Sequence, residues 1–84
     1  MPSKLQEYPP HQHVRSGCKV SWLYYAKEED ARKAAAAAKA NAKILAAQGF
    51  DFGYQSPGYI DKLADDLSIK EWSEYAGMYE VCIP

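Results

Sequence analysis

Two histidines and two cysteines are the side chains of this chain best suited to bind a metal or attack a substrate. His11 and His13 lie close together, whereas Cys18 and Cys82 are separated by most of the sequence. A structural zinc site usually takes its ligands in pairs that are each close in sequence, and the cysteines do not form such a pair. No sequence neighbour marks either cysteine as an activated nucleophile. We therefore predict no metal site and no cofactor.

The other polar motifs also lack a catalytic or phosphate-binding pattern. Asp65 and Asp66 are adjacent acids, which on a helix or loop are typical of a solvated surface. Gly53 and Gly58 fit neither the dinucleotide-binding nor the P-loop spacing. The sequence therefore predicts no catalytic residues, and we expect a protein that is not an enzyme.

A helix from about Lys27 to Gln48 is the element that the sequence encodes most clearly. Alanine has the highest helix propensity, and residues 34–38 are all alanine. Gly49 is placed to end the helix in a left-handed conformation, and the apolar Phe50 follows it as in a Schellman ending. One stripe of the helix carries Ala31, Ala34, Ala35, Ala38, Ala42 and Leu45. So flat a stripe predicts close packing against a sheet that supplies the larger side chains.

Three short strands are predicted around this helix. Alternation of side chains indicates a first strand from Cys18 to Tyr25, in which we expect Trp22 to face the helix. The same pattern predicts a second strand over residues 51–55 and a last strand over residues 79–83.

Two segments between the second and last strands are also assigned from spacing. Apolar residues at 60, 63, 64 and 67 fit a helix with Ser56 as its cap and Pro57 at its first position. A turn into a continuing strand fits residues 59–67 almost as well. Ser68 and Glu71 have the spacing of a capping box, which predicts a short helix that ends at Gly77.

Together these elements predict a single two-layer α+β domain over residues 14–84. The long alanine-rich helix packs on a small three-stranded sheet, in the order β-α-β-(short α)-β, with the strand order left open. Residues 1–13 contain three prolines and no periodicity, so we expect an extended or mobile N-terminal arm. No apolar run approaches the ~20 residues of a membrane span, and we expect a cytoplasmic protein.

The carboxyl-terminal part of the chain is acidic and aromatic, which favours protein binding. Residues 49–84 carry seven acidic and two basic side chains, whereas residues 1–48 carry four and eight. Tyrosine and tryptophan are enriched in interface cores, and the acidic charge suits a protein partner with a basic surface. The expected partner-binding residues are Tyr54, Tyr59, Asp61, Asp65, Asp66, Trp72, Glu74 and Tyr75. Because a chain of 84 residues can bury only a small core, a homodimer is a further expectation.

A nucleic-acid-binding domain is the alternative function. Arg32, Lys39 and Lys43 share one edge of the long helix and could contact phosphates. Dedicated nucleic-acid-binding proteins tend to be basic, because phosphate neutralisation provides most of the affinity. The formal net charge of this chain is -1, so protein binding is the favoured prediction.

In size, in its single βα unit with extra strands and in its lack of a chemical motif, the chain resembles the small orphan proteins of bacteriophages and mobile elements, among them the anti-CRISPR inhibitors. The resemblance lies in the plan, since no family motif is matched and no functional residue is carried over. It implies a phage-type inhibitor that occludes a surface of a host defence or nucleic-acid-handling complex in the bacterial cytoplasm.

Overall fold

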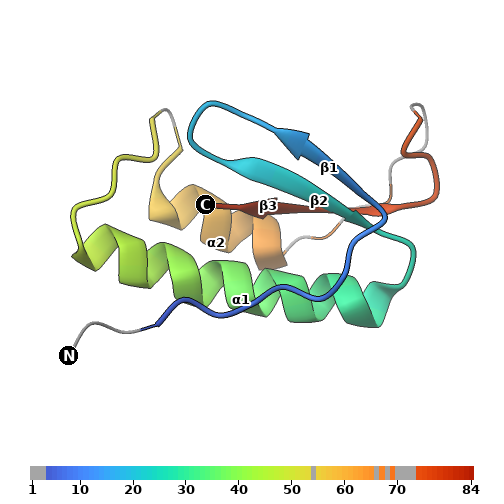
Figure 1. Ribbon diagram of the computed structural model, residues 1–84, viewed down its shortest axis with the longest axis horizontal. Helices are drawn as coiled ribbons and strands as arrows, with labels where there is room; N and C mark the ends of the chain where they lie inside the picture. The colour runs from blue at the N-terminus through green and yellow to red at the C-terminus, as the bar shows by residue number, and fades with distance from the viewer. Residues whose placement is uncertain (1–3, 54, 66, 68, 70–73) are drawn as a thin grey trace.

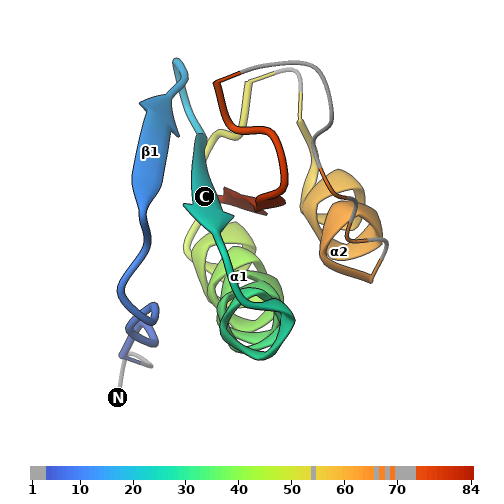
Figure 2. The same cartoon turned by 90° about the vertical axis from the view of Figure 1, so that its right-hand side faces the viewer.

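The computed structural model describes residues 4–53, 55–65, 67, 69 and 74–84. Its elements in chain order are β1 (His13–Ser16), β2 (Ser21–Tyr25), α1 (Glu28–Ala47), α2 (Pro57–Asp65) and β3 (Tyr79–Ile83). The strands form one antiparallel sheet in the order β1-β2-β3. α1 packs under this sheet, and α2 packs beside α1 and β3 (Figure 1, Figure 2). The predicted α+β class is confirmed, although the order of elements is β-β-α-α-β.

The helix α1 lies where the sequence predicts it. It spans Glu28–Ala47, and Gly49 follows with a φ of 82°. The Phe50 N–H donates to the Leu45 carbonyl at 2.9 Å, and the Gly49 N–H donates to the Ala46 carbonyl at 3.0 Å. These two bonds are those of a Schellman motif, so the predicted helix ending is confirmed.

The alanine stripe of α1 packs against large side chains of the sheet. Ala31 and Ala34 are fully buried in one cluster with Leu23, Tyr25 and Val81. Small residues on the helix therefore face large residues on the sheet, the complementary arrangement that a close-packed interior needs.

Both faces of β2 carry side chains that pack on buried clusters. Leu23 and Tyr25 join a cluster with Ala31 and Ala34 of α1. Trp22, which was expected to face the helix, is partly buried against a second cluster that includes Ala38 and Ala42 of α1. Trp22 also pairs with Arg15 of β1, whose guanidinium carbon lies 4.1 Å from the centroid of the indole ring. By alternation Trp22 and Tyr24 lie on the sheet face opposite to Leu23 and Tyr25, which we call the outer face.

The strand β1 is absent from the sequence prediction. All four of its residues are exposed, so it lacks the buried positions that make alternation visible. It joins β2 through a tight hairpin, in which the Gly17 N–H donates to the Val20 carbonyl at 2.8 Å.

The strand predicted over residues 51–55 is also wrong, since none of its described residues belongs to a strand. Phe52 is buried, but Gly53 turns the chain with a φ of 69°. The Gly53 N–H donates to Asp51 Oδ1 at 2.8 Å, which is the turn that an aspartate side chain commonly makes with its own backbone. The strand was therefore predicted from a single buried ring, that of Phe52, which lies next to a turn.

The segment for which the sequence allowed either a helix or a strand forms a helix, α2. Ser56 Oγ accepts a hydrogen bond from the Tyr59 N–H at 3.2 Å, and Pro57 is the first residue of α2. Ile60 and Ala64, one turn apart, are buried. The predicted cap and the predicted helical spacing are therefore confirmed.

The last part of the chain ends in the predicted strand. β3 covers Tyr79–Ile83, as expected. Half of the short helix predicted from Ser68 lies outside the described residues, and its described end, residues 74–77, forms a turn and not a helix. Ile69 makes an isolated antiparallel bridge to Tyr79.

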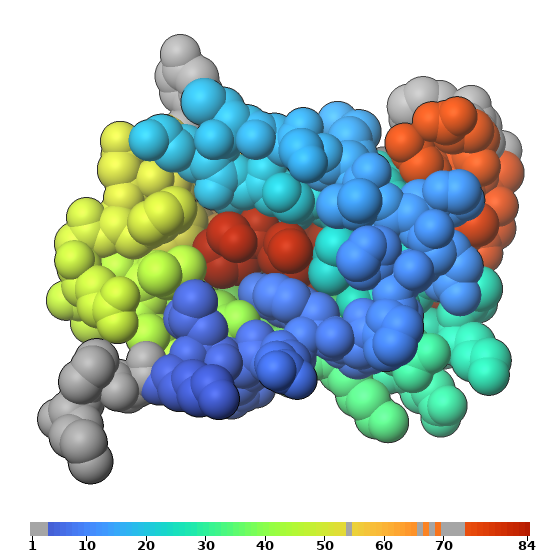
Figure 3. Space-filling model, in the orientation of Figure 1, coloured from blue at the N-terminus to red at the C-terminus, as the bar shows by residue number. Residues whose placement is uncertain are grey.

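Residues 4–12 run along α1 (Figure 1, Figure 3). Asn41 of α1 is buried and ties this segment to the helix. Its Oδ1 accepts from the Gln6 N–H at 2.7 Å, and its Nδ2 donates to the Gln6 carbonyl and to Tyr8 Oη, each at 2.9 Å. Ala37 and Asn41 are buried in addition to the predicted stripe, so the buried side of α1 is wider than that stripe.

Tyr25 provides a second tie to the same segment. Its hydroxyl donates to the Pro9 carbonyl at 2.8 Å. Burial, followed by the nearby charge of Asp30, raises the pKa of Tyr25 to about 12. The hydroxyl therefore keeps the proton that it donates up to strongly alkaline pH.

Replacing Asn41 with alanine should release residues 4–12 from α1. The change removes three part-buried hydrogen bonds to Gln6 and Tyr8, which should cost about 1–3 kcal/mol of folding free energy. Urea unfolding measures the loss, and hydrogen exchange should show faster exchange at the Gln6 amide. Lys43→Ala, at an exposed position of α1, is the matched control. Unchanged protection of Gln6 in Asn41→Ala would contradict the prediction.

Candidate functional site

Two of the acidic residues predicted to bind a partner are engaged within the chain. Lys39 of α1 contacts the Asp65 carboxylate of α2, and its Nζ lies 3.7 Å from Asp61 Oδ1. The hydrogen bond to Asp65 raises the pKa of Lys39, so the Lys39 ammonium keeps its charge. These acids therefore link α2 to α1, which reduces the negative charge available to a basic partner.

The other described members of that set lie on different elements. Tyr59 is 44% exposed at the start of α2, and Glu74 is exposed. The ring of Tyr75 stacks on Tyr24 of β2, with 4.0 Å between the ring centroids. The set is thus divided between α2 and the outer sheet face. Tyr54, Asp66 and Trp72 lie outside the described residues.

The basic edge considered for nucleic-acid binding is partly neutralised. Arg32 Nη2 lies 2.7 Å from Glu28 Oε1, one helical turn away, and Lys39 is paired as described. Lys43 is exposed on α1. Two of the three cations therefore have an anionic partner in the chain itself, which weakens their attraction for phosphate.

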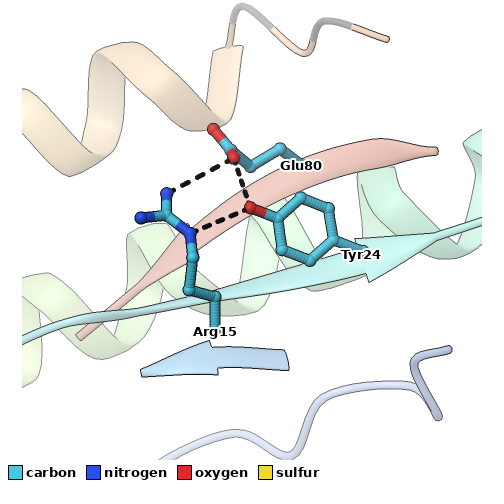
Figure 4. A network of polar contacts seen from close by, with 3 residues as sticks. All are labelled: Arg15, Tyr24 and Glu80. Atoms are coloured by element: carbon cyan, nitrogen blue, oxygen red, sulfur yellow. Dashed lines mark hydrogen bonds and ion pairs between the residues drawn. The ribbon is translucent and has the colours of Figure 1, made fainter. Parts of the chain in front are cut away.

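A polar network joins the three strands on the outer face of the sheet (Figure 4). Tyr24 Oη donates to Glu80 Oε2 at 2.6 Å and accepts from Arg15 Nε at 3.2 Å. Arg15 Nη2 also lies 3.7 Å from Glu80 Oε2. Burial and the hydrogen bond to Glu80 raise the pKa of Tyr24, so its hydroxyl remains a donor. The network fixes β1, β2 and β3 to one another, and sequence spacing alone gave no sign of it.

Replacing Tyr24 with phenylalanine should destabilise the sheet. The substitution keeps the ring that stacks on Tyr75 and removes only the hydroxyl, so the hydrogen bond from Tyr24 to Glu80 is lost. Hydrogen bonds to charged groups contribute about 1.5–3 kcal/mol, and urea unfolding should show a loss in that range. Tyr59→Phe is the matched control, because Tyr59 is exposed. Equal stability of the two variants would contradict the structural role of the network.

The β1–β2 hairpin and the segment after α1 come together at one end of the molecule (Figure 1). An apolar cleft is lined by residues of both. We refer to it as the hairpin cleft. Its volume is about 250 Å³. Its lining consists of Cys18, Lys19, Val20, Trp22, Phe52, Gly53 and Gln55. The sequence analysis did not bring these residues together, because the two segments are thirty or more positions apart.

Two glycines shape the walls of the hairpin cleft. A Cβ atom at Gly17 would lie 2.6 Å from the Val20 carbonyl oxygen and 2.7 Å from the Trp22 ring, so a side chain there would displace the indole. Gly53 has a positive φ and passes close to Lys19, whose Cγ would lie 3.2 Å from a Cβ at that position. Val20 and Phe52 are buried, so two of the lining residues belong to the packed interior.

The hairpin cleft contains one thiol, that of Cys18, which is exposed. The second free thiol, that of Cys82, is buried, and burial raises its pKa to about 11. Among the described residues, no three histidine, cysteine or acidic side chains gather closely enough to hold a metal ion. The cleft can therefore offer apolar contact, a lysine cation and a side-chain amide.

Neither described helix is long and apolar enough to span a bilayer. No protein-family model matches the chain, and searches of curated proteins and of solved structures found no similar sequence or fold.

Proposed function

We propose that this protein is a non-enzymatic protein-binding module that holds a partner side chain in the hairpin cleft. The supporting observation is the size and lining of the cleft. Pockets that enclose free small molecules usually measure about 300–1,000 Å³, whereas this cleft measures about 250 Å³. Such a volume suits one large side chain, and interfaces concentrate much of their binding energy in side chains buried in preformed pockets.

The favoured biological role is stoichiometric inhibition, as the resemblance to phage-type orphan proteins implies. An inhibitor of this kind covers a surface of a host defence or nucleic-acid-handling complex and needs no chemistry of its own. The pairing of Arg32 with Glu28 and of Lys39 with Asp65 makes nucleic-acid binding by that helix edge the less favoured role.

A reversible chemical plug of the cleft tests the proposal. Benzyl methanethiosulfonate should add a benzylthio group to Cys18 of the folded protein, and dithiothreitol removes it. Tagged protein is used to capture partners from nuclease-treated bacterial lysate, before plugging, after plugging and after reduction. We expect a protein captured in stoichiometric amount by the free protein, reduced at least tenfold by the plug and recovered on reduction.

Two controls separate occlusion from side effects. The smaller methyl methanethiosulfonate adduct should leave most capture intact, and Cys18→Ser treated with the benzyl reagent should behave as untreated protein. Capture that the benzyl plug does not reduce would refute binding at the cleft. Material that is retained only when nuclease is omitted would instead establish the nucleic-acid alternative.

A further inference from the structure

We infer that the hairpin cleft accepts an aromatic side chain flanked by carboxylates, so that the partner is acidic at this site. The inference rests on the proposed function and specifies the chemistry of the partner. It differs from the basic partner that the acidic half of the sequence suggests, because the charges around the cleft come from the other half of the chain.

The charge around the cleft is positive. Residues 8–27, which include the whole hairpin, contain Arg15, Lys19 and Lys27 and no acidic residue. Lys19 lines the cleft, and it makes no ion pair within the described part of the chain. Arg15 lies over the ring of Trp22, which lines the cleft, but the Arg15 guanidinium is also paired with the Glu80 carboxylate. Lys19 is therefore the principal charge that a partner would meet.

The carboxylate closest in sequence to the lining residues, that of Asp51, does not neutralise the Lys19 charge within the cleft. Asp51 precedes the Phe52 wall, but its Oδ1 accepts the Gly53 N–H and it is not a lining residue. A cation bordering a cleft that contains no carboxylate favours an anionic group on the partner, because interfaces place opposite charges together.

The walls favour an aromatic occupant. Trp22 and Phe52 present rings to the cleft, and aromatic pairs gain energy beyond simple burial when stacked or edge to face. A cavity of about 150 Å³ accommodates benzene, so a cleft of about 250 Å³ has room for a phenol or an indole. Aliphatic side chains would leave more of this space unfilled.

Gln55 adds a polar contact at the same place. Its side chain lines the cleft, and its Oε1 atom is buried without a hydrogen-bond donor. The terminal torsion of glutamine is broad, so a small rotation can present the amide oxygen to an occupant. An indole N–H or a phenol O–H would supply the missing donor, which favours tryptophan or tyrosine over phenylalanine.

Peptide selection tests this chemistry directly. Random dodecapeptides displayed on yeast are selected on the full protein and depleted on the protein plugged at Cys18 with the benzylthio group. We expect enrichment of sequences that hold tryptophan or tyrosine within two residues of aspartate or glutamate. A synthetic peptide with an Asp-Trp-Glu core should bind at least fivefold more tightly than its Lys-Trp-Lys counterpart, and added salt should reduce the difference.

Lys19→Glu provides the matched variant. Lys19 is exposed, so the substitution should leave the fold intact, and we expect it to weaken the acidic peptide about two- to fivefold and to strengthen the basic one. Indole-3-acetate serves as a free aromatic carboxylate, and it should bind more weakly than the acidic peptide.

Three results would overturn the inference. They are enrichment of basic flanks, enrichment without aromatic residues, and tighter binding of indole-3-acetate than of any selected peptide. If one of them occurs while capture from lysate still depends on the open cleft, the protein-binding function stands and only the partner chemistry is wrong. If capture is insensitive to the plug, the proposed function itself fails.

Discussion

Replacing Ala34 with leucine should destabilise the fold by about 3 kcal/mol or more, whereas the same change at Ala36 should have almost no effect. Both residues belong to the five-alanine block of α1, so helix propensity is altered equally. Ala34 is completely buried against the large side chains of the sheet, whereas Ala36 is exposed. Extra methyl groups in a filled layer force side chains off their rotamers or shift the backbone, typically at 1–3 kcal/mol and sometimes more.

We place Ala34 at the upper end of that range because α1 and the sheet approach closely along the alanine stripe. A domain of this size has a total stability of roughly 4–12 kcal/mol, so the variant should lose a large part of it. Thermal unfolding should show a midpoint lower by about 12–24 °C, against a change within about 0.5 kcal/mol for Ala36→Leu. Similar losses for both variants would contradict the packing described here.

Local signals predicted the parts of the fold that depend on few residues. The long helix, its ending at Gly49 and the cap of α2 at Ser56 each follow from propensity or from side-chain-to-backbone bonds between near neighbours. The alternation of β3 is likewise visible because part of it is buried. These features could be predicted because the same residues that form them also reveal them.

The errors arose where tertiary contacts decide the structure. β1 is fully exposed, so its sequence has no alternation, and it exists because β2 offers an edge for pairing. Alternation alone could not assign a single face of β2 to α1, because both faces carry large side chains. Leu23 and Tyr25 belong to one buried cluster with α1, and Trp22 packs on a second cluster that also contains α1 residues. The same indole lies under Arg15 and lines the hairpin cleft.

The candidate site was beyond sequence reasoning for a similar reason. The cleft joins the hairpin to Phe52 and Gln55 across the long helix. Likewise, Asp61 and Asp65 looked like free acids until the folded chain placed Lys39 beside them. One signal was available: Gly17 stands five residues before a tryptophan in a hairpin, and its lack of a side chain is what admits the indole.

The two thiols should differ by at least a hundredfold in their rate of reaction with a maleimide at pH 8. The thiolate is the reacting species, and Cys82 is only 2% exposed, with a pKa raised to about 11 by burial and by the charge of Glu80. At pH 8 about one part in a thousand of that thiol is therefore ionised. Cys18 is exposed in the hairpin, where the reagent can reach it directly.

Mass spectrometry of the intact protein should show a single adduct under native conditions, and peptide mapping should place it on Cys18. Two adducts should form in urea, because unfolding exposes Cys82 and removes the cause of its raised pKa. Cys18→Ser is the matched control, and in the native state it should take up almost no label. Rapid labelling of that variant would mean that a reagent reaches Cys82 in the folded protein, and it would contradict the burial of this side chain. Selective reaction would instead establish Cys18 as a single reporter in the wall of the hairpin cleft, so that loss of its reactivity on adding a peptide measures occupation of the cleft.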